Sequence, residues 1–70
     1  MESVYKVIEI VGSSDESWER AAHAALEKAA ASLRDLRIAE IVAQDVHLSD
    51  TGDILAYRVK MKVSFKYAGD

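Results

Sequence analysis

The 70-residue sequence has no cysteine and no proline, three glycines and one tryptophan. Without cysteine it forms no disulfide, and two histidines, His23 and His47, fall short of the nitrogen and sulfur ligands of a structural zinc site. Long apolar runs are also missing. Glu2, Lys6 and Glu9 interrupt the first ten residues, so neither a signal peptide nor a membrane span is readable there. We therefore expect a cytoplasmic protein.

The chain is long enough for one domain, residues 1–70, with a small core. A domain of this size buries only about 60% of the surface that its unfolded chain exposes, and disulfides, metals or other subunits usually stabilise it. Because the sequence lacks the first two, we expect it to oligomerise. Its net charge of −3 offers no broad basic surface for nucleic acid. It also has no glycine-rich phosphate loop and no recognisable catalytic constellation, which argues against an enzyme.

The apolar pattern begins with a strand and a helix. Residues 4–11 are rich in β-branched side chains and predict a first strand that Gly12 ends. Apolar residues then recur at helical spacing from Trp18 to Leu36 and predict one amphipathic helix of roughly five or six turns. Either Ser13 or Ser14 is its expected cap, and Ser13 with Glu16 fits a capping box.

Two further strands are expected at residues 37–50 and 54–67, joined by a turn at residues 50–53, with a frayed end at residues 68–70. A β-α-β crossover is right-handed, so the third strand should lie between the first and second, antiparallel to both. The fold class is therefore α+β: a three-stranded antiparallel sheet with one helix on one face. The other face of the sheet has no cover within the chain.

The hairpin register decides which side chains lie on that predicted uncovered face. A three-residue loop, residues 50–52, places Ser49 opposite Asp53. It predicts three pairs on the helix side, Ile41 with Met61, Ala43 with Val59 and Ala39 with Val63. It predicts three on the uncovered face, Glu40 with Lys62, Val42 with Lys60 and Gln44 with Arg58. A two-residue loop would bury Glu40, and an unpaired buried carboxylate is costly.

Strict alternation leaves Asp45 on the helix side, where a bulge near Gln44 and Asp45 would relieve it. The predicted uncovered face also carries apolar side chains, namely those of Ile38, Val42, Val46 and Leu48. A solvated face has no need of them, whereas an interface with copies of the same subunit does.

Over its whole length the sequence resembles the dodecin family. The matching stretches are VYKVIEIVGSS, SLRDLR, IAEIVAQDV and YRVKMKVSFK. The resemblance implies a hollow homododecamer in which each sheet wraps partly around its helix. It also implies a protein that stores or scavenges riboflavin or FMN, stacked between aromatic residues in pockets between subunits. Some members of the family hold coenzyme A or metal ions.

The resemblance also identifies two departures. The flavin-stacking tryptophan of the family corresponds to Ile38, and the glutamine that bonds the flavin ring edge corresponds to Arg58. Isoleucine has no π face, so about 0.5–1.5 kcal/mol per aromatic pair is lost, and Arg58 brings a charge into a neutral site. Trp18, at the start of the helix, should pack on the other face of the sheet. With Ile38 and Arg58 together, the sequence resembles a divergent branch that includes a calcium-binding member.

The polar residues of the strands have two readings each. Glu40, Gln44 and Asp45 are candidate oxygen ligands for calcium where symmetry gathers several copies, but simple cross-strand pairing explains Glu40 and Gln44 as well. Lys60, Lys62 and Lys66, with Arg58, are candidates for holding a phosphate or coenzyme A. Alternatively, they form a ladder of ion pairs with Glu9 and Glu40.

Three functions therefore stay open. The first is a flavin store that tolerates Ile38. The second is a shell that binds calcium, another ion or a phosphorylated cofactor such as coenzyme A. The third is a structural assembly without a ligand.

Overall fold

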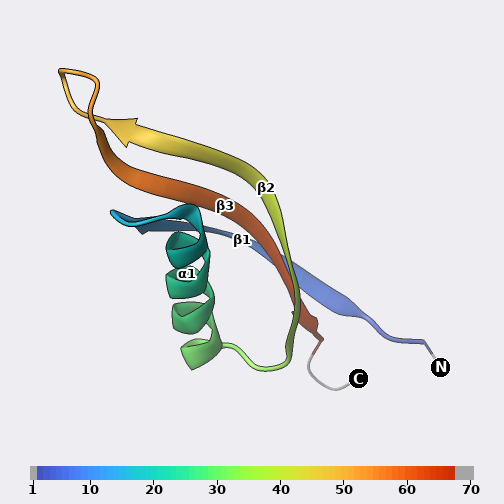
Figure 1. The fold of residues 1–70 in the computed structure, drawn as a ribbon. Helices are drawn as coiled ribbons and strands as arrows, with labels where there is room; N and C mark the ends of the chain where they lie inside the picture. Colours follow the sequence, from blue (N-terminus) through green and yellow to red (C-terminus); the bar gives the residue numbers. More distant parts are fainter. Residues whose placement is uncertain (1, 68–70) are drawn as a thin grey trace.

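The computed structural model describes residues 2–67, so the frayed end predicted at residues 68–70 lies outside the described residues. Its elements are β1 (Tyr5–Ser14), α1 (Trp18–Ser32), β2 (Leu36–Leu48) and β3 (Ile54–Lys66). β3 lies between β1 and β2 and is antiparallel to both. Figure 1 shows α1 on one side of this curved sheet and the β2–β3 hairpin extending beyond it. The predicted β-α-β-β order and strand arrangement are confirmed.

The sequence pattern predicted that Gly12 ends the first strand. Instead, Gly12 lies within β1. A β-carbon on Gly12 would stand 2.1 Å from the carbonyl oxygen of Ala21 and 2.9 Å from the β-carbon of Ala25. Real side chains do not approach a backbone oxygen this closely, so only glycine fits. The missing side chain and the alanines of α1 therefore set the short distance between helix and sheet.

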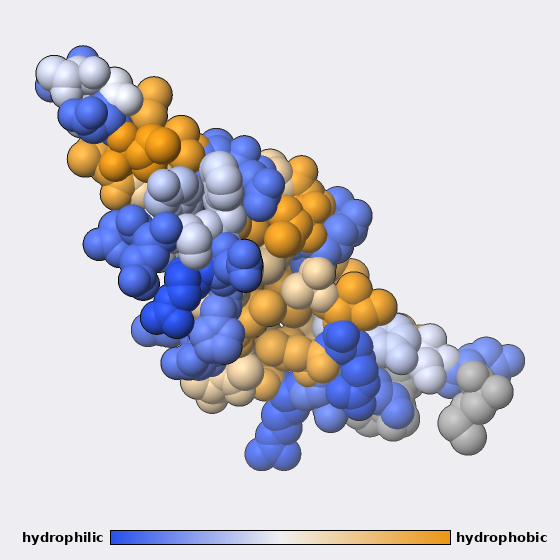
Figure 2. Space-filling model, in the orientation of Figure 1, coloured by the Kyte–Doolittle hydropathy of each residue, from blue (hydrophilic) through white to orange (hydrophobic). Residues whose placement is uncertain are grey.

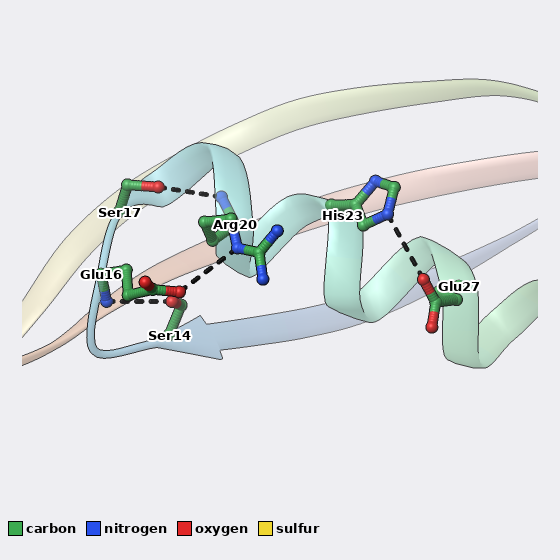
Figure 3. A network of polar contacts seen from close by, with 6 residues as sticks. All are labelled: Ser14, Glu16, Ser17, Arg20, His23 and Glu27. Carbon is green, nitrogen blue, oxygen red and sulfur yellow. Dashed lines mark hydrogen bonds and ion pairs between the residues drawn. The ribbon is translucent and has the colours of Figure 1, made fainter.

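The helix begins later than predicted, because β1 continues through Ser13 and Ser14. Its cap is Ser17, whose Oγ accepts a hydrogen bond of 3.0 Å from the backbone N–H of Arg20. Ser14 instead accepts from the backbone N–H of Glu16, and the Glu16 carboxylate lies 3.3 Å from Arg20 Nε (Figure 3). The predicted capping box of Ser13 and Glu16 is thus wrong, although the serine-rich segment does supply the cap.

The helix also ends earlier than predicted. It has 15 residues, and the backbone N–H of Leu33 closes the last turn on the carbonyl oxygen of Ala29 at 2.8 Å. Leu33 itself has an extended backbone, which ends the helix, and Asp35 in the following turn has a φ of 59°. Leu36 continues the helical spacing of the sequence but belongs to β2, from which it packs against the core.

The core lies between α1 and β3 and is small. Ala21, Val59, Met61 and Val63 are buried, and apolar residues of β1, α1 and β2 pack around them. Many large apolar side chains stay exposed, including Val7, Val11, Ile41, Ile54 and Leu55. Figure 2 shows such residues in patches along the length of the molecule. A chain that leaves this much apolar surface in water gains by associating with other copies.

The hairpin register is partly confirmed. Ser49 and Asp53 close the three-residue loop with a hydrogen bond of 2.8 Å from Ser49 N to Asp53 O. Three predicted pairs are present, namely Ile41 with Met61, Ala39 with Val63 and Glu40 with Lys62. The other three are wrong. The pairing of β2 with β3 has three register shifts, and two of them, with Val42 on β2 and Leu55 on β3 as the extra residues, bound the segment that carries these pairs.

Between these two bulges, residues 43–47 are displaced by one position along β3. Ala43 pairs with Lys60, Gln44 with Val59 and Asp45 with Arg58. A displacement of one residue turns every side chain to the opposite face. Asp45 therefore leaves the helix side, where burial of its carboxylate would be unfavourable. Gln44 and Val46 join the helix side, contrary to the prediction. The expected bulge exists, but it lies at Val42 rather than at Gln44 and Asp45.

Candidate functional site on the helix-free face

The face of the sheet opposite α1, called here the helix-free face, is built of four rows that run across β1, β3 and β2. The register of the strands gives these rows as Val7–Ser64–Ile38, Glu9–Lys62–Glu40, Val11–Lys60–Ala43 and Ser13–Arg58–Asp45. Cations of β3 thus stand between β1 and β2, and each of the two outer strands contributes carboxylates. The arrangement is a ladder of alternating charge with apolar side chains at its end.

The first hollow of this face, the Ile38 pocket, is a cavity of about 480 Å³ lined by Val7, Ile8, Glu9, Ile38, Glu40, Lys62 and Ser64. Ile38 is 67% exposed at its edge. Its lining is partly aliphatic and partly polar, with a lysine between two glutamates in one row. None of the residues that line this cavity is aromatic, so the described chain offers no surface there on which a planar ring system can stack.

The second hollow, the Arg58 pocket, is a cavity of about 300 Å³ lined by Val11, Ala43, Asp45, Arg58 and Lys60. Arg58 donates from Nε and Nη2 to the two carboxylate oxygens of Asp45, each at 2.7 Å. This hydrogen bonding lowers the pKa of Asp45 below its ordinary value of 3.8 and raises that of Arg58. Lys60 Nζ lies 3.4 Å from Oε1 of Glu9. Both cations of the pocket are therefore paired with a carboxylate of a neighbouring strand.

Trp18 supports this arrangement from the other side of the sheet. As predicted, it lies at the start of α1 on the helix side, where its ring meets that of Tyr57 edge-on at a centroid distance of 5.0 Å. Its indole Nε1 also donates to the backbone carbonyl oxygen of Asp45 at 3.1 Å. The first turn of the helix thereby holds the backbone of the displaced segment whose side chain reaches Arg58.

The structure separates some of the predicted site residues and joins others. Gln44 leaves Arg58 and lines a groove beside α1, with Trp18 and Ile41 among its neighbours. Asp45 takes the place beside Arg58 that the predicted register assigned to Gln44. The pair of Asp45 and Arg58 was missed because it depends on both bulges, although the unfavourable burial of a carboxylate signalled that the register had to shift.

One chain does not assemble a calcium site. Residues 2–67 bring together no group of three or more histidine, aspartate or glutamate side chains that would hold a metal ion. Calcium takes six to eight oxygen ligands, and both oxygens of Asp45 are occupied by Arg58. A calcium site on this face would require carboxylates from several copies.

None of the helices in the described part of the chain has the length and apolar character to span a membrane.

Comparison with known proteins agrees with the fold. Residues 4–68 match the protein family described as dodecin. The chain is a dodecin. It is 48% identical over 64 residues to calcium dodecin of Mycobacterium tuberculosis (strain ATCC 25618 / H37Rv). The match covers 91% of this chain and 89% of that protein.

Solved dodecin structures superimpose closely on this chain. The crystal structure of calcium dodecin from Mycobacterium tuberculosis, described as having a novel calcium-binding site, has a TM-score of 0.84 and 46% identity, and the match covers 97% of this chain and 96% of that one. Dodecin from Streptomyces davaonensis has a TM-score of 0.88 and 33% identity, over 96% and 97% of the two chains. Dodecins are non-enzymatic ligand-binding proteins, and members of the family form homododecamers.

Proposed function

We propose that this dodecin is a homododecameric ligand store that binds a divalent cation, with calcium as the candidate, and that flavin binding is weak or lost. The observation that carries the proposal is the composition of the Ile38 pocket. Its lining combines aliphatic side chains with two carboxylates, Lys62 and Ser64, and Ile38 stands in the position that resembles the flavin-stacking site of the family. The 48% identity to calcium dodecin supports the same choice of ligand.

The argument against flavin rests on contact area and on charge. A planar ligand at Ile38 would lose the stacking contribution of about 0.5–1.5 kcal/mol per aromatic pair, and no other ring lines the pocket to replace it. Arg58, which resembles the residue that contacts the flavin ring edge, already makes two hydrogen bonds to Asp45. A neutral ring edge would have to compete with a carboxylate for the same donors.

The argument for a cation rests on Glu40. It stands in the same row as Lys62 and Glu9 on the helix-free face. Glu9 approaches Lys60 at 3.4 Å, whereas within residues 2–67 no ion pair reaches Glu40, so its carboxylate remains available. Affinity for calcium rises with the number of charged ligands. A dodecamer can bring together the Glu40 side chains of several copies, whereas one chain supplies a single Glu40.

Calcium titration of the purified dodecamer, by calorimetry and by thermal melting, tests the proposal. A cation that binds only the folded assembly at one hundred times its Kd adds about 2.7 kcal/mol to the free energy of unfolding, so the melting temperature should rise with calcium. Glu40→Gln should weaken calcium binding by about tenfold or more. The matched control is Asp50→Asn, which removes the same charge in the hairpin turn.

A parallel riboflavin titration, followed by flavin fluorescence, separates the candidate functions. We expect no saturable quenching. An intact dodecamer that ignores calcium but quenches riboflavin would overturn the proposal in favour of a flavin store. One that responds to neither would overturn it in favour of a structural assembly.

A further inference from the structure

The Arg58 pocket contains the side chains of a potential anion site. Arg58 and Lys60 line one cavity of about 300 Å³ on the same face of β3. We propose that Asp45 closes this pocket to phosphate-bearing ligands by occupying the guanidinium of Arg58 from within the chain. The inference deepens the proposed function, on which it rests, because it names a class of ligand that this dodecin excludes.

The pair occupies two of the five N–H donors of the guanidinium, on the side formed by Nε and Nη2. A planar guanidinium binds carboxylate and phosphate in the same bidentate way, through two parallel N–H donors. In this structure Nε and Nη2 both donate to Asp45 at 2.7 Å. A phosphate that took these donors would displace Asp45, whose unpaired carboxylate would then lie beside the new anion and repel it.

The position of Asp45 is fixed by the fold. Asp45 stands directly opposite Arg58 only because the bulges at Val42 and Leu55 displace the segment between them. The hydrogen bond of 3.1 Å from Trp18 Nε1 holds its backbone carbonyl. The carboxylate is therefore tethered beside Arg58, and a free anion has to compete with this intramolecular partner.

The second cation of the pocket is occupied in a similar way. Lys60 lies 3.4 Å from Glu9 of β1, so each cation is paired with one carboxylate from an outer strand and the charges of these two pairs cancel. This pairing weakens the electrostatic attraction of a phosphate before contact as well as within the site. Neither cation that lines this pocket is left without a carboxylate partner.

Asp45→Asn tests the inference, because it removes the charge and keeps the size of the side chain. The probe is inorganic pyrophosphate, titrated into the intact dodecamer by calorimetry at low salt. We expect no saturable binding to the wild type. Asp45→Asn should bind pyrophosphate with a Kd at least about tenfold below the highest concentration at which the wild type shows no binding. This binding should weaken as the salt concentration rises. The gain should disappear in the double variant Asp45→Asn, Arg58→Gln. Asp50→Asn, with the same change in net charge, should behave as the wild type.

Two results would overturn the inference: an intact Asp45→Asn dodecamer that binds no pyrophosphate, or a wild type that binds it equally well. Calcium titration of the same variant separates this inference from the proposed function. Retained calcium binding supports Asp45 as an anion-excluding residue. A loss of calcium binding without a gain in pyrophosphate binding overturns that role and makes Asp45 a cation ligand. A gain in pyrophosphate binding in a dodecin that never binds calcium supports the exclusion and overturns only the proposed function.

Discussion

The indole Nε1 of Trp18 donates a hydrogen bond of 3.1 Å to the backbone carbonyl oxygen of Asp45. This bond joins the first turn of α1 to the segment of β2 that lies between the two bulges. The side chain of Asp45 in turn holds Arg58 on the opposite face of the sheet. The start of the helix and the polar pair of the helix-free face are thus connected through one residue.

Replacing Trp18 by phenylalanine isolates that hydrogen bond. Trp18→Phe keeps an aromatic ring against Tyr57 but leaves the carbonyl oxygen of Asp45 without its indole donor. We expect the free energy of unfolding to fall by about 0.5–1.5 kcal/mol, the usual net contribution of a hydrogen bond. Because Trp18 is the single tryptophan, unfolding should be followed by circular dichroism at fixed protein concentration. An unchanged midpoint would show that the bond contributes nothing.

The close approach of α1 to β1 predicts a larger effect at Gly12. In Gly12→Ala the new methyl group would meet the carbonyl oxygen of Ala21 at 2.1 Å, and a backbone atom cannot move aside as a flexible side chain does. Overpacking of this kind costs about 1–3 kcal/mol, and we expect the upper half of that range in denaturant unfolding. The control is Ser13→Ala, at the next and exposed position of β1, which should change stability by less than about 0.5 kcal/mol. Equal stability of the two variants would contradict the packing argument.

Much of the fold is predictable from the sequence because β3 alternates cleanly. Val59, Met61 and Val63 are buried, as the pattern indicates, and the charged residues between them face away from the helix. The closing turn is equally legible, since Gly52 has the φ of 88° that its three-residue loop needs. Topology then follows from the handedness of the crossover.

The helix cap and the position of the bulge were not predictable, because the sequence allows several local structures of similar stability at each. Ser13, Ser14 and Ser17 are all good caps, and only the length of the pairing with β3 decides that Ser17 is used. A bulge is a local exchange of one residue, and strict alternation does not show whether it falls at Val42 or three residues later. The displaced segment carries the partner of Arg58, so the candidate site was less predictable than the core.

Restoring an aromatic surface tests whether the Ile38 pocket still has the shape of a flavin site. Ile38→Trp combined with Arg58→Gln should produce saturable quenching of riboflavin fluorescence in the assembled dodecamer. The added ring should supply about 0.5–1.5 kcal/mol of stacking per aromatic pair. Arg58→Gln alone should not quench, because Ile38 still offers no ring. If the assembled double variant ignores riboflavin, Ile38 and Arg58 do not mark the flavin position in this dodecin.

The pair of Asp45 and Arg58 predicts a pH dependence of stability whose sign is fixed by the direction of the shift. The hydrogen bond from Arg58 lowers the pKa of Asp45 in the folded protein below the ordinary value of 3.8. Above that value the carboxyl group is ionised in both the folded and unfolded chains, and the contribution of the pair is complete. As the pH falls below it, the unfolded chain binds the proton first, so stability declines until the folded carboxyl is protonated too.

A double-mutant cycle of Asp45→Asn and Arg58→Gln isolates this effect from the other acidic residues. The coupling between the two positions, measured from thermal melting at fixed ionic strength, should be constant from about pH 7 to about pH 5. It should shrink as the pH falls below 3.8, because Arg58 keeps its charge while Asp45 loses its own. The coupling should also weaken with added salt, since both side chains are exposed. A coupling that stays the same at the lowest pH would mean that shape, rather than charge, holds the two side chains together.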